Sequence, residues 1–444
     1  MATKIAFVSL GCPKNQIDTE VMLAHLVSEG FEIVPEDINA DVVIINTCGF
    51  IQSAKEEAIE NILDVAWLKE NRSLKAIVVT GCLVERYGEE IIKELPEVDA
   101  IVGCGSIHEI GDAVRAALEK SEKKYVDIKP VNELRLGGDR VITTPQYTAY
   151  LKIAEGCSNC CSYCAIPKIR GKFRSRPMED IIAEAKVLTN LGAKEIIVVA
   201  QDTTRYGIDL YGEYKLPELL EKLCENKDIK WIRVLYCYPE LITDKLIDVF
   251  AKNEQIVKYI DIPIQHINDD ILGKMNRRGG SEAIKTAVKK LRERVPGIVI
   301  RSTVICGFPT ETRAQWNELC EFLADAKFER LGAFAYSAEE GTKAAEMDGQ
   351  ISEKEKSRRA DVIMDKQQQI VEDFNNQRLG KTVKVLCEGY DRANKIYYGR
   401  SEADAPDIDA KVYFHSKTRR IKDGEIIDVL LTDTIDLDML GETV

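Results

Sequence analysis

The sequence predicts an α/β protein in three parts: an N-terminal open parallel α/β domain, a central partial β/α barrel and a C-terminal small all-β barrel of OB-like type. The first two parts are predicted because short β-branched runs alternate with helical patterns, in two separate series along the 444 residues. The third follows from a change near residue 380 to short alternating strands without helices. The expected domains are 1–125, 140–375 and 380–444.

In the first series, the β-branched runs predict a parallel sheet and the intervening patterns predict the helices that cover it. The expected strands are Lys4–Leu10, Asp41–Asn46, Ala76–Thr80 and Ala100–Val102. The expected helices are Thr19–Glu29, Ser53–Lys69 and Val84–Leu95. The charged stretch Lys120–Pro145 contains Gly and Pro and predicts a linker.

The second series contains about six β/α units, which predict a full or partial parallel barrel with its active site at the carboxyl ends of the strands. The expected strands are Ala149–Ile153, Glu195–Ala200, Trp231–Tyr236, Tyr259–Pro263, Ile298–Ile305 and Arg330–Phe334. The expected helices are Glu179–Leu191, Leu216–Glu225, Glu282–Val295 and Arg313–Ala326.

A long charged helix, roughly Ser352–Leu379, leads to the C-terminal barrel. Its expected strands are Thr382–Glu388, Ile396–Arg400, Lys411–Phe414 and Glu425–Thr432. Barrels of this type often bind RNA. Lys381–Val444 holds ten Lys and Arg against thirteen Asp and Glu, so we expect an acidic barrel that suits phosphate contacts poorly.

The composition favours a cytoplasmic globular protein. The net charge of −13 argues against broad nonspecific nucleic-acid binding. The N-terminus MATKIAFVSL lacks the apolar core of a signal peptide, and no apolar run approaches the roughly 20 residues of a membrane span. The thirteen cysteines are expected to stay reduced in the cytosol. Because the four histidines are scattered, thiolate is the expected ligand of any metal.

The stretch EGCSNCCSYC, residues 155–164, follows the first expected barrel strand and contains four cysteines. One interpretation is two abutting C-x-x-C pairs that bind zinc, but adjacent Cys160 and Cys161 would both have to reach one tetrahedral ion. The other interpretation is C-x-x-x-C-x-x-C, with Cys160 outside the set. Three thiolates suit a 4Fe–4S cluster that keeps one iron open.

More cysteines follow the expected strands of the first domain: Cys12 in SLGCPKN, Cys48 in INTCGF, Cys82 in VTGCL and Cys104 in IVGCG. Ligands of open α/β sheets bind outside the carboxyl ends of the strands. Three or four of these thiols are therefore expected to converge as a second ligand set. The alternative for each one is a buried packing cysteine.

The motif C-x-x-x-C-x-x-C, embedded in AEGCSNCCSYCAIPKIRGKFRSRP, resembles the radical S-adenosylmethionine (SAM) superfamily. Together with GCPKN, NTCGF and TGC, essentially the whole chain resembles the methylthiotransferases, which end in a TRAM-type barrel. AQDTTRYGID, DIPIQHIND, MNRRG and AYSAEEGTKAA are similar to the RimO-type branch. That branch methylthiolates an aspartate of small-subunit ribosomal protein uS12. The segment VICGFPTE departs mildly from the family's IVGFPGE, at Cys306 and Thr310.

The resemblance implies two 4Fe–4S clusters, one on Cys12, Cys48 and Cys82 and one on the barrel set. The barrel set is Cys157, Cys161 and Cys164. The barrel cluster would chelate SAM and cleave it to a 5′-deoxyadenosyl radical, which abstracts hydrogen from the β-carbon of the target aspartate. The other cluster would hold the sulfur or methylthio group, and a second SAM would supply the methyl. A low-potential donor such as flavodoxin or ferredoxin is implied, without a membrane, and nucleic acid is not expected as a direct substrate.

Other candidates lie at strand ends facing the expected barrel mouth. Gln201, Asp202 and Glu311 are expected near SAM or substrate, with helix capping as the alternative. The basic loop of Arg170, Lys172, Arg174 and Arg176 either contacts SAM or an acidic group or is solvated. The remaining cysteines are expected to pack or to be bystanders; they are Cys104, Cys160, Cys224, Cys237, Cys306, Cys320 and Cys387.

Two other functions compete with this hypothesis. A tRNA methylthiotransferase acting on isopentenyladenosine would carry the same clusters and would be favoured by a basic surface on the C-terminal barrel. A metal-stabilised RNA-binding scaffold would need only one closed metal site, and this hypothesis does not explain the N-terminal set of thiols.

Overall fold

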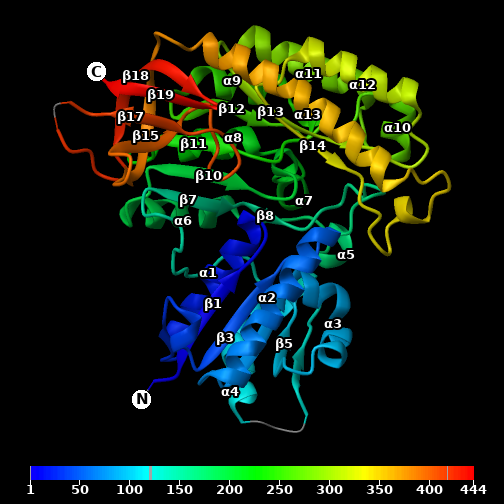
Figure 1. Ribbon diagram of the computed structural model, residues 1–444, viewed down its shortest axis with the longest axis vertical. Coiled ribbons are helices and arrows are strands. Elements are labelled where there is room, and N and C mark those ends of the chain that lie inside the picture. Colours follow the sequence, from blue (N-terminus) through cyan, green and yellow to red (C-terminus); the bar gives the residue numbers. More distant parts are fainter. Residues whose placement is uncertain (1, 120–122, 418) are drawn as a thin grey trace.

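The computed structural model describes residues 2–119, 123–417 and 419–444. It has three domains, and the N-terminal one lies beneath the other two in the view of Figure 1. The N-terminal sheet has the strand order β2-β1-β3-β4-β5-β6, and every pair in it is parallel. Its strands are β1 Lys4–Ser9, β2 Glu32–Ile33, β3 Val42–Thr47, β4 Ala76–Gly81, β5 Ala100–Val102 and β6 Tyr125–Asp127.

Helices cover both faces of this sheet, as expected for parallel strands. They are α1 Pro13–Ser28, α2 Gln52–Asn71, α3 Cys82–Glu94 and α4 Ile110–Leu118. Helices α1 and α4 pack on one face, and α2 and α3 pack on the other. The expected linker Lys120–Pro145 is partly wrong, because its residues Tyr125–Asp127 form β6 and extend the sheet. Lys120–Glu122, at the start of that expected linker, lie outside the described residues.

The central domain is a six-stranded parallel sheet of order β14-β13-β12-β11-β10-β7 that does not close, so the partial barrel is confirmed. Its strands are β7 Thr148–Lys152, β10 Glu195–Val199, β11 Trp231–Val234, β12 Ile256–Asp261, β13 Val299–Cys306 and β14 Arg330–Ala335. The hairpin of β8 Ala154–Glu155 and β9 Arg174–Ser175 stands at its mouth.

Most helices of this domain cover the outside of the barrel sheet (Figure 1). They are α6 Met178–Asn190, α8 Leu216–Leu223, α9 Asp244–Lys252, α10 Asp269–Lys274, α11 Gly280–Arg294, α12 Arg313–Ala326 and α13 Glu353–Asn376. The short helix α5 Ile166–Ile169 packs against the N-terminal domain, and the short helix α7 Ile208–Tyr211 lies beside β9. The long helix α13 packs beside the last strands through the buried Ile363 and a hydrogen bond from Gln367 to the Phe328 carbonyl. None of the described helices combines the length and the apolar character that a membrane crossing requires.

The C-terminal domain is a closed five-stranded barrel of order β15-β16-β17-β19-β18. Its strands are β15 Thr382–Asp391, β16 Ile396–Ser401, β17 Val412–His415, β18 Ile426–Ile435 and β19 Asp438–Thr443. Four of them match the expected runs, whereas β19 was not expected. Small apolar side chains, including Val385, Val412, Val429 and Met439, fill the interior.

The C-terminal barrel packs into the concave face of the open central sheet. Leu386 and Ala405 join an apolar cluster with Tyr150, Trp231 and Tyr259 of the central strands. Since these side chains, together with Ile197 of β10, come from four adjacent strands, the small barrel fills the space that a closed β/α barrel would occupy with its own strands.

Buried ion pairs fix this docking. The Arg400 guanidinium of the small barrel lies 2.6 Å from Glu195 of β10, and Arg233 of β11 lies 2.9 Å from the same carboxylate. Burial opposes ionisation of Glu195, but the two guanidinium groups hold its pKa at about 2. Asp404 accepts a hydrogen bond from Arg330 at 2.5 Å, and Asp409 accepts one from the Tyr259 hydroxyl at 2.6 Å.

The expected acidic character of the barrel surface stays a prediction. Several carboxylates of the small barrel are buried or half-buried at this interface, so the barrel's charges are exposed to different degrees. Nine Lys and Arg side chains between Lys381 and Val444 are exposed, against five Asp and Glu. The exposed carboxylates are those of Asp407, Asp423, Asp428, Asp433 and Asp436.

Candidate active site

The barrel cysteines lie on the loop after β8, at the carboxyl end of the first central strand. Cys157 and Cys161 are buried and Cys164 is half-buried, whereas Cys160 is exposed and has a backbone φ of +53°. Burial raises the pKa of Cys157 to about 11, with smaller contributions from Asp202 and Cys161. Burial also raises the pKa of Cys164, and the neighbouring Cys161 adds to that rise. Three thiols therefore share one environment, and Cys160 lies apart from it.

Close backbone packing gives the loop its shape. Gly156 has φ +78°, and a Cβ at this position would lie 2.2 Å from the Lys172 carbonyl oxygen. The Asn276 side chain donates to the Cys160 carbonyl at 2.8 Å, and the Asn159 side chain donates to Asp202 at 2.8 Å. The loop is thus held by residues from distant parts of the barrel.

An aromatic and cationic wall faces the loop. The Tyr238 hydroxyl lies 3.8 Å from the Cys161 sulfur. The Arg277 guanidinium lies 4.1 Å from the centre of the Tyr238 ring and donates to the Pro263 carbonyl at 2.6 Å. A guanidinium stacked on an aromatic face is an effective way to hold a positive charge beside a cluster of thiolates.

The N-terminal cysteines occupy matching positions at the carboxyl ends of their strands. Cys12 precedes α1, Cys48 follows β3 and Cys82 begins α3. Burial raises the pKa of Cys48 to about 11, and the nearby Cys82 and Cys12 thiols add to that rise. Gly11, with φ +92°, leaves room for Cys48, whose Cβ lies 2.9 Å from where a Gly11 Cβ would stand. The fold places these three thiols near one another, and their role as a ligand set stays a prediction.

Cys104 lies next to Cys82 of this set. It is buried against Cys82, Ala165 and Ile169. A hydrogen bond with Cys104, together with the charge of Arg170, lowers the pKa of Cys82 to about 6. The packing role expected for Cys104 stays a prediction.

Among the described residues, no group of three or more His, Cys, Asp or Glu side chains is placed to ligate one metal ion. A 4Fe–4S cluster binds each of its protein thiolates through a different iron. Ligation of such a cluster by each three-cysteine set stays a prediction, and so does the four-thiolate zinc alternative for residues 155–164.

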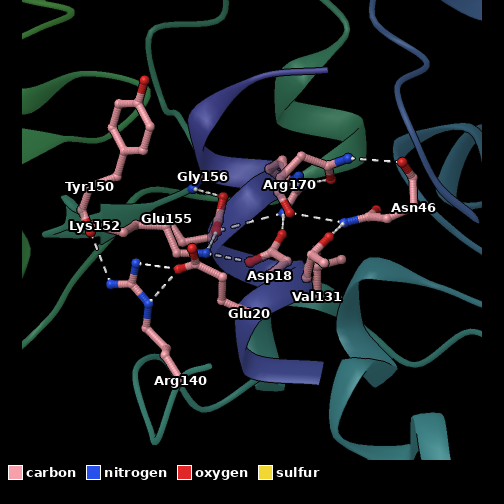
Figure 2. A network of polar contacts seen from close by, with 12 residues as sticks. Asp18, Glu20, Asn46, Val131, Arg140, Tyr150, Lys152, Glu155, Gly156 and Arg170 are labelled. Carbon is pink, nitrogen blue, oxygen red and sulfur yellow. Dashed lines mark hydrogen bonds and ion pairs between the residues drawn. The ribbon is translucent and has the colours of Figure 1, made fainter. Parts of the chain in front are cut away.

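A buried ionic network joins the N-terminal and central domains between the two sets of cysteines (Figure 2). Lys152 of β7 lies 2.6 Å from Asp18 of α1 and 2.7 Å from Glu155, and Arg170 pairs with Asp18 as well. Arg170 also donates to the Asn15 side chain at 2.8 Å and to the Cys82 sulfur at 3.3 Å. A residue of the barrel loop thus contacts a thiol of the N-terminal set.

The network also reaches one of the expected site residues. Burial opposes the charge of Glu155, but Lys152 and Arg170 hold its pKa at about 2. Gln201, directly after β10, donates to this carboxylate at 2.6 Å. The other side-chain atom of Gln201, Oε1, is buried without a hydrogen-bond partner. An unsatisfied acceptor of this kind at the barrel mouth suits a ligand that donates a hydrogen bond.

Asp202 and Glu311 lie where expected, but the protein itself uses both carboxylates. Asp202 is fully buried and accepts from Asn159, Thr204 and Arg205. Glu311 is buried and accepts from His266 at 3.0 Å, from the Gly307 amide at 2.8 Å and from Arg359. These bonds match the alternative of a structural role more closely than contact with SAM.

The basic loop is not solvated as a whole, and two of its arginines pair with acidic groups of the protein itself. Arg170 belongs to the buried network, and Arg176 is buried beside Glu184 at 2.6 Å. Arg174 donates to the carbonyls of Val131 and Leu134, which fixes the interdomain segment on the hairpin. Only Lys172 is exposed.

Sequence reasoning missed most of the residues that join the two domains. Asp18, Lys152 and Glu155 were not singled out, nor was the second network, in which Arg140 binds Glu20 at 2.5 Å and also pairs with Glu184. One signal was available: Lys152 ends β7 and stands between the apolar Leu151 and Ile153. A buried lysine at such a position implies a buried carboxylate partner.

Comparison with known proteins places this geometry in a family. Three family models match: the uncharacterized protein family UPF0004 over residues 4–103, the radical SAM superfamily over 151–323 and the TRAM domain over 379–444. Among solved structures, the radical SAM methyltransferase TsrM from Kitasatospora setae, with cobalamin and a 4Fe–4S cluster bound, gives a TM-score of 0.56. It is 15% identical and aligns over 76% of this chain and 75% of its own, which shows a shared fold.

Curated relatives extend over the whole chain. The ribosomal protein uS12 methylthiotransferase RimO of Pelotomaculum thermopropionicum is 50% identical, with 100% of both chains covered. The enzyme of the same name from a Thermoanaerobacter species is 46% identical, with 99% of both chains covered. The resemblance expected from the motifs is therefore confirmed, and the chain belongs to the RimO family of ribosomal protein uS12 methylthiotransferases within the radical SAM superfamily.

Proposed function

We propose that this protein methylthiolates the β-carbon of an aspartate of ribosomal protein uS12. The observation that carries the proposal is the pair of three-thiol sets, joined by a buried network, in a chain that is half identical to a uS12 methylthiotransferase over its full length. The radical SAM superfamily implies a 4Fe–4S cluster and SAM. Two clusters are part of the proposal.

Each cluster would have three protein ligands. Cys157, Cys161 and Cys164 would hold the SAM-binding cluster in the barrel, since their thiols share one buried environment. The second cluster would be held by the N-terminal thiols, namely Cys12, Cys48 and Cys82. When bound, these groups supply a 5′-deoxyadenosyl radical that removes hydrogen from the unactivated β-carbon and a methylthio group that replaces it.

The chain's own residues position these groups and exclude water. Glu155, kept ionised by Lys152 and Arg170, orients Gln201, whose free Oε1 would accept a hydrogen bond from SAM or substrate. The N-terminal domain covers the barrel mouth, where the Lys14 ammonium lies 3.5 Å from the centre of the Tyr236 ring. Radical chemistry requires such coverage because it prevents side reactions with solvent.

A second candidate substrate is isopentenylated tRNA. The exposed Lys and Arg side chains of the C-terminal barrel favour it, because neutralised phosphates dominate the affinity for nucleic acid. The names of the relatives favour uS12. We further propose that the enzyme acts in the cytoplasm with a low-potential donor such as flavodoxin or ferredoxin.

The test of the cluster assignment compares two neighbouring cysteines. Anaerobically reconstituted protein should hold about eight irons and eight sulfides per chain. Cys161→Ala should lower the iron content by about half and abolish 5′-deoxyadenosine production, because two thiolates do not hold the barrel cluster. Cys160→Ser is the matched control and should keep both, since its side chain is exposed. Equal metal loss in the two variants would refute the three-ligand assignment.

A further inference from the structure

Helix α2 carries two apolar stripes, of which the structure covers one. Ala58, Ile62 and Val65 pack against the N-terminal sheet. Ile59, Leu63 and Trp67 are spaced by four residues and therefore lie on one side of the helix, where they are 39%, 47% and 53% exposed.

Trp67 is unusual among the tryptophans of this protein. The other two, Trp231 and Trp316, are only 2% and 7% exposed. Single exposed apolar residues are common, but a continuous row that ends in a tryptophan is typical of a protein interface.

Acidic side chains surround the exposed row. The exposed charged residues of α2 are all acidic; they are Glu56, Glu57, Glu60, Asp64 and Glu70. The two lysines of the helix are engaged elsewhere, Lys55 with Glu339 at 3.1 Å and Lys69 with Asp99 at 2.6 Å. Arg72, just beyond the helix, lies 6.0 Å from the centre of the Trp67 ring. The surface is an apolar row bordered by negative charge.

The row leads away from the proposed reaction centre. Helix α2 begins at Gln52, four residues after Cys48, and its first turns contact the central domain through Lys55. At 1.5 Å per residue the helix is about 30 Å long, so Trp67 lies roughly 22 Å from its start. Figure 1 shows α2 running from the junction of the two domains along the outer face of the N-terminal domain. A protein bound along the row would therefore reach the barrel mouth with one end.

We propose that the Ile59–Leu63–Trp67 row is a docking surface for the substrate, ribosomal protein uS12. A protein that binds ribosomal RNA must present Lys and Arg to phosphates, and such a surface complements the carboxylates beside the row. A second copy of this chain fits poorly, because a symmetric contact would bring Glu60 and Asp64 against the same residues of the other copy. This inference rests on the proposed function and assigns part of substrate recognition to the N-terminal domain.

The experiment measures steady-state modification of purified uS12 by the reconstituted full-length enzyme and its L63A/W67A variant. Truncation of an aromatic anchor costs binding energy that corresponds to an increase of about tenfold or more in KM. We expect that increase, with kcat changed less than twofold and with unchanged cleavage of SAM in the absence of uS12. The matched control is V187A/L191A on the central domain, where the two side chains are 56% and 55% exposed and also four residues apart. Its KM should equal that of the wild type.

A second variant keeps the apolar row and removes charge. Glu60→Gln with Asp64→Asn should raise KM and flatten its dependence on salt, since exposed charges are screened. This charge variant also keeps the proposal testable if L63A/W67A fails to fold. The docking proposal would be overturned if the folded variants kept the wild-type KM and its salt dependence. It would also be overturned if the wild-type enzyme formed concentration-dependent dimers that only L63A/W67A abolishes. Absence of uS12 modification by the wild-type enzyme itself would instead refute the proposed function.

Discussion

Replacement of Arg170 by alanine should destabilise the junction between the N-terminal and central domains. Arg170 is buried and pairs with Asp18, and it lies 3.7 Å from Glu155. Its removal leaves these two carboxylates with the single cation Lys152. Loss of one partner from a buried ionic group typically costs about 3–5 kcal/mol, because a charge remains buried without compensation.

The pKa of Glu155 shows how strongly the network stabilises this carboxylate and how that stabilisation depends on pH. The network holds this pKa at about 2, against an ordinary value of 4.5. The difference of roughly 2.5 units corresponds to about 3 kcal/mol for the network as a whole, to which Lys152 contributes more than Arg170. A depressed carboxyl pKa stabilises the fold above pH 4.5 and loses that effect as the pH falls toward 2. The difference in the free energy of unfolding between wild type and R170A should therefore be largest at pH 7 and should decrease below pH 4.5.

The assay is urea denaturation of the metal-free protein at several pH values, with hydrogen exchange of α1 and β7 as the local measurement. Arg358→Ala is the control, because Arg358 pairs with Glu355 at the surface and such pairs contribute little. R170A should lower the urea concentration at the unfolding midpoint and should speed up hydrogen exchange of the α1 amides, and the control should change neither. Equal stability of R170A and wild type at pH 7 would refute the reasoning.

Three further predictions test other parts of the account. Gly156→Ala should lose the barrel cluster and about half of the iron, because its φ is +78° and its Cβ would clash with the Lys172 carbonyl; iron analysis tests this. Asp404→Ala should loosen the C-terminal barrel, at about 3 kcal/mol or more, because the Arg330 cation stays buried. Limited proteolysis should detect this, and exposed Asp407→Ala should not change the pattern. Cys48→Ala should still cleave SAM but should form no methylthiolated product, and mass spectrometry of uS12 with 5′-deoxyadenosine analysis tests both.

The sequence predicted those elements whose residues follow a local period. The central strands and the positions of both cysteine sets at strand ends agree with the structure, because alternation and turn residues are local signals. Strand β6 was missed because its three residues, Tyr125–Asp127, are too few to show a period. Strand β19 was missed because Asp438–Thr443 is a largely polar run.

The contacts between distant segments were not predictable in the same way. Lys152 and Asp18 are 134 residues apart, and nothing local to either residue identifies the other. Glu311 lies in the loop between β13 and α12, and its partners His266 and Arg359 come from other segments. The charge count of the C-terminal barrel is also an incomplete guide to its surface, since it includes the buried Asp404 and Arg400. Burial must be known before charge indicates a partner.

Competition between the two candidate substrates tests the central claim most directly. Reconstituted enzyme, SAM and a low-potential reductant are incubated with equal amounts of purified uS12 and isopentenylated tRNA, and both are analysed by mass spectrometry. We predict that one aspartate of uS12 exchanges a β-hydrogen for a methylthio group while the tRNA is unchanged. A methylthio group on the tRNA with unmodified uS12 would contradict the account.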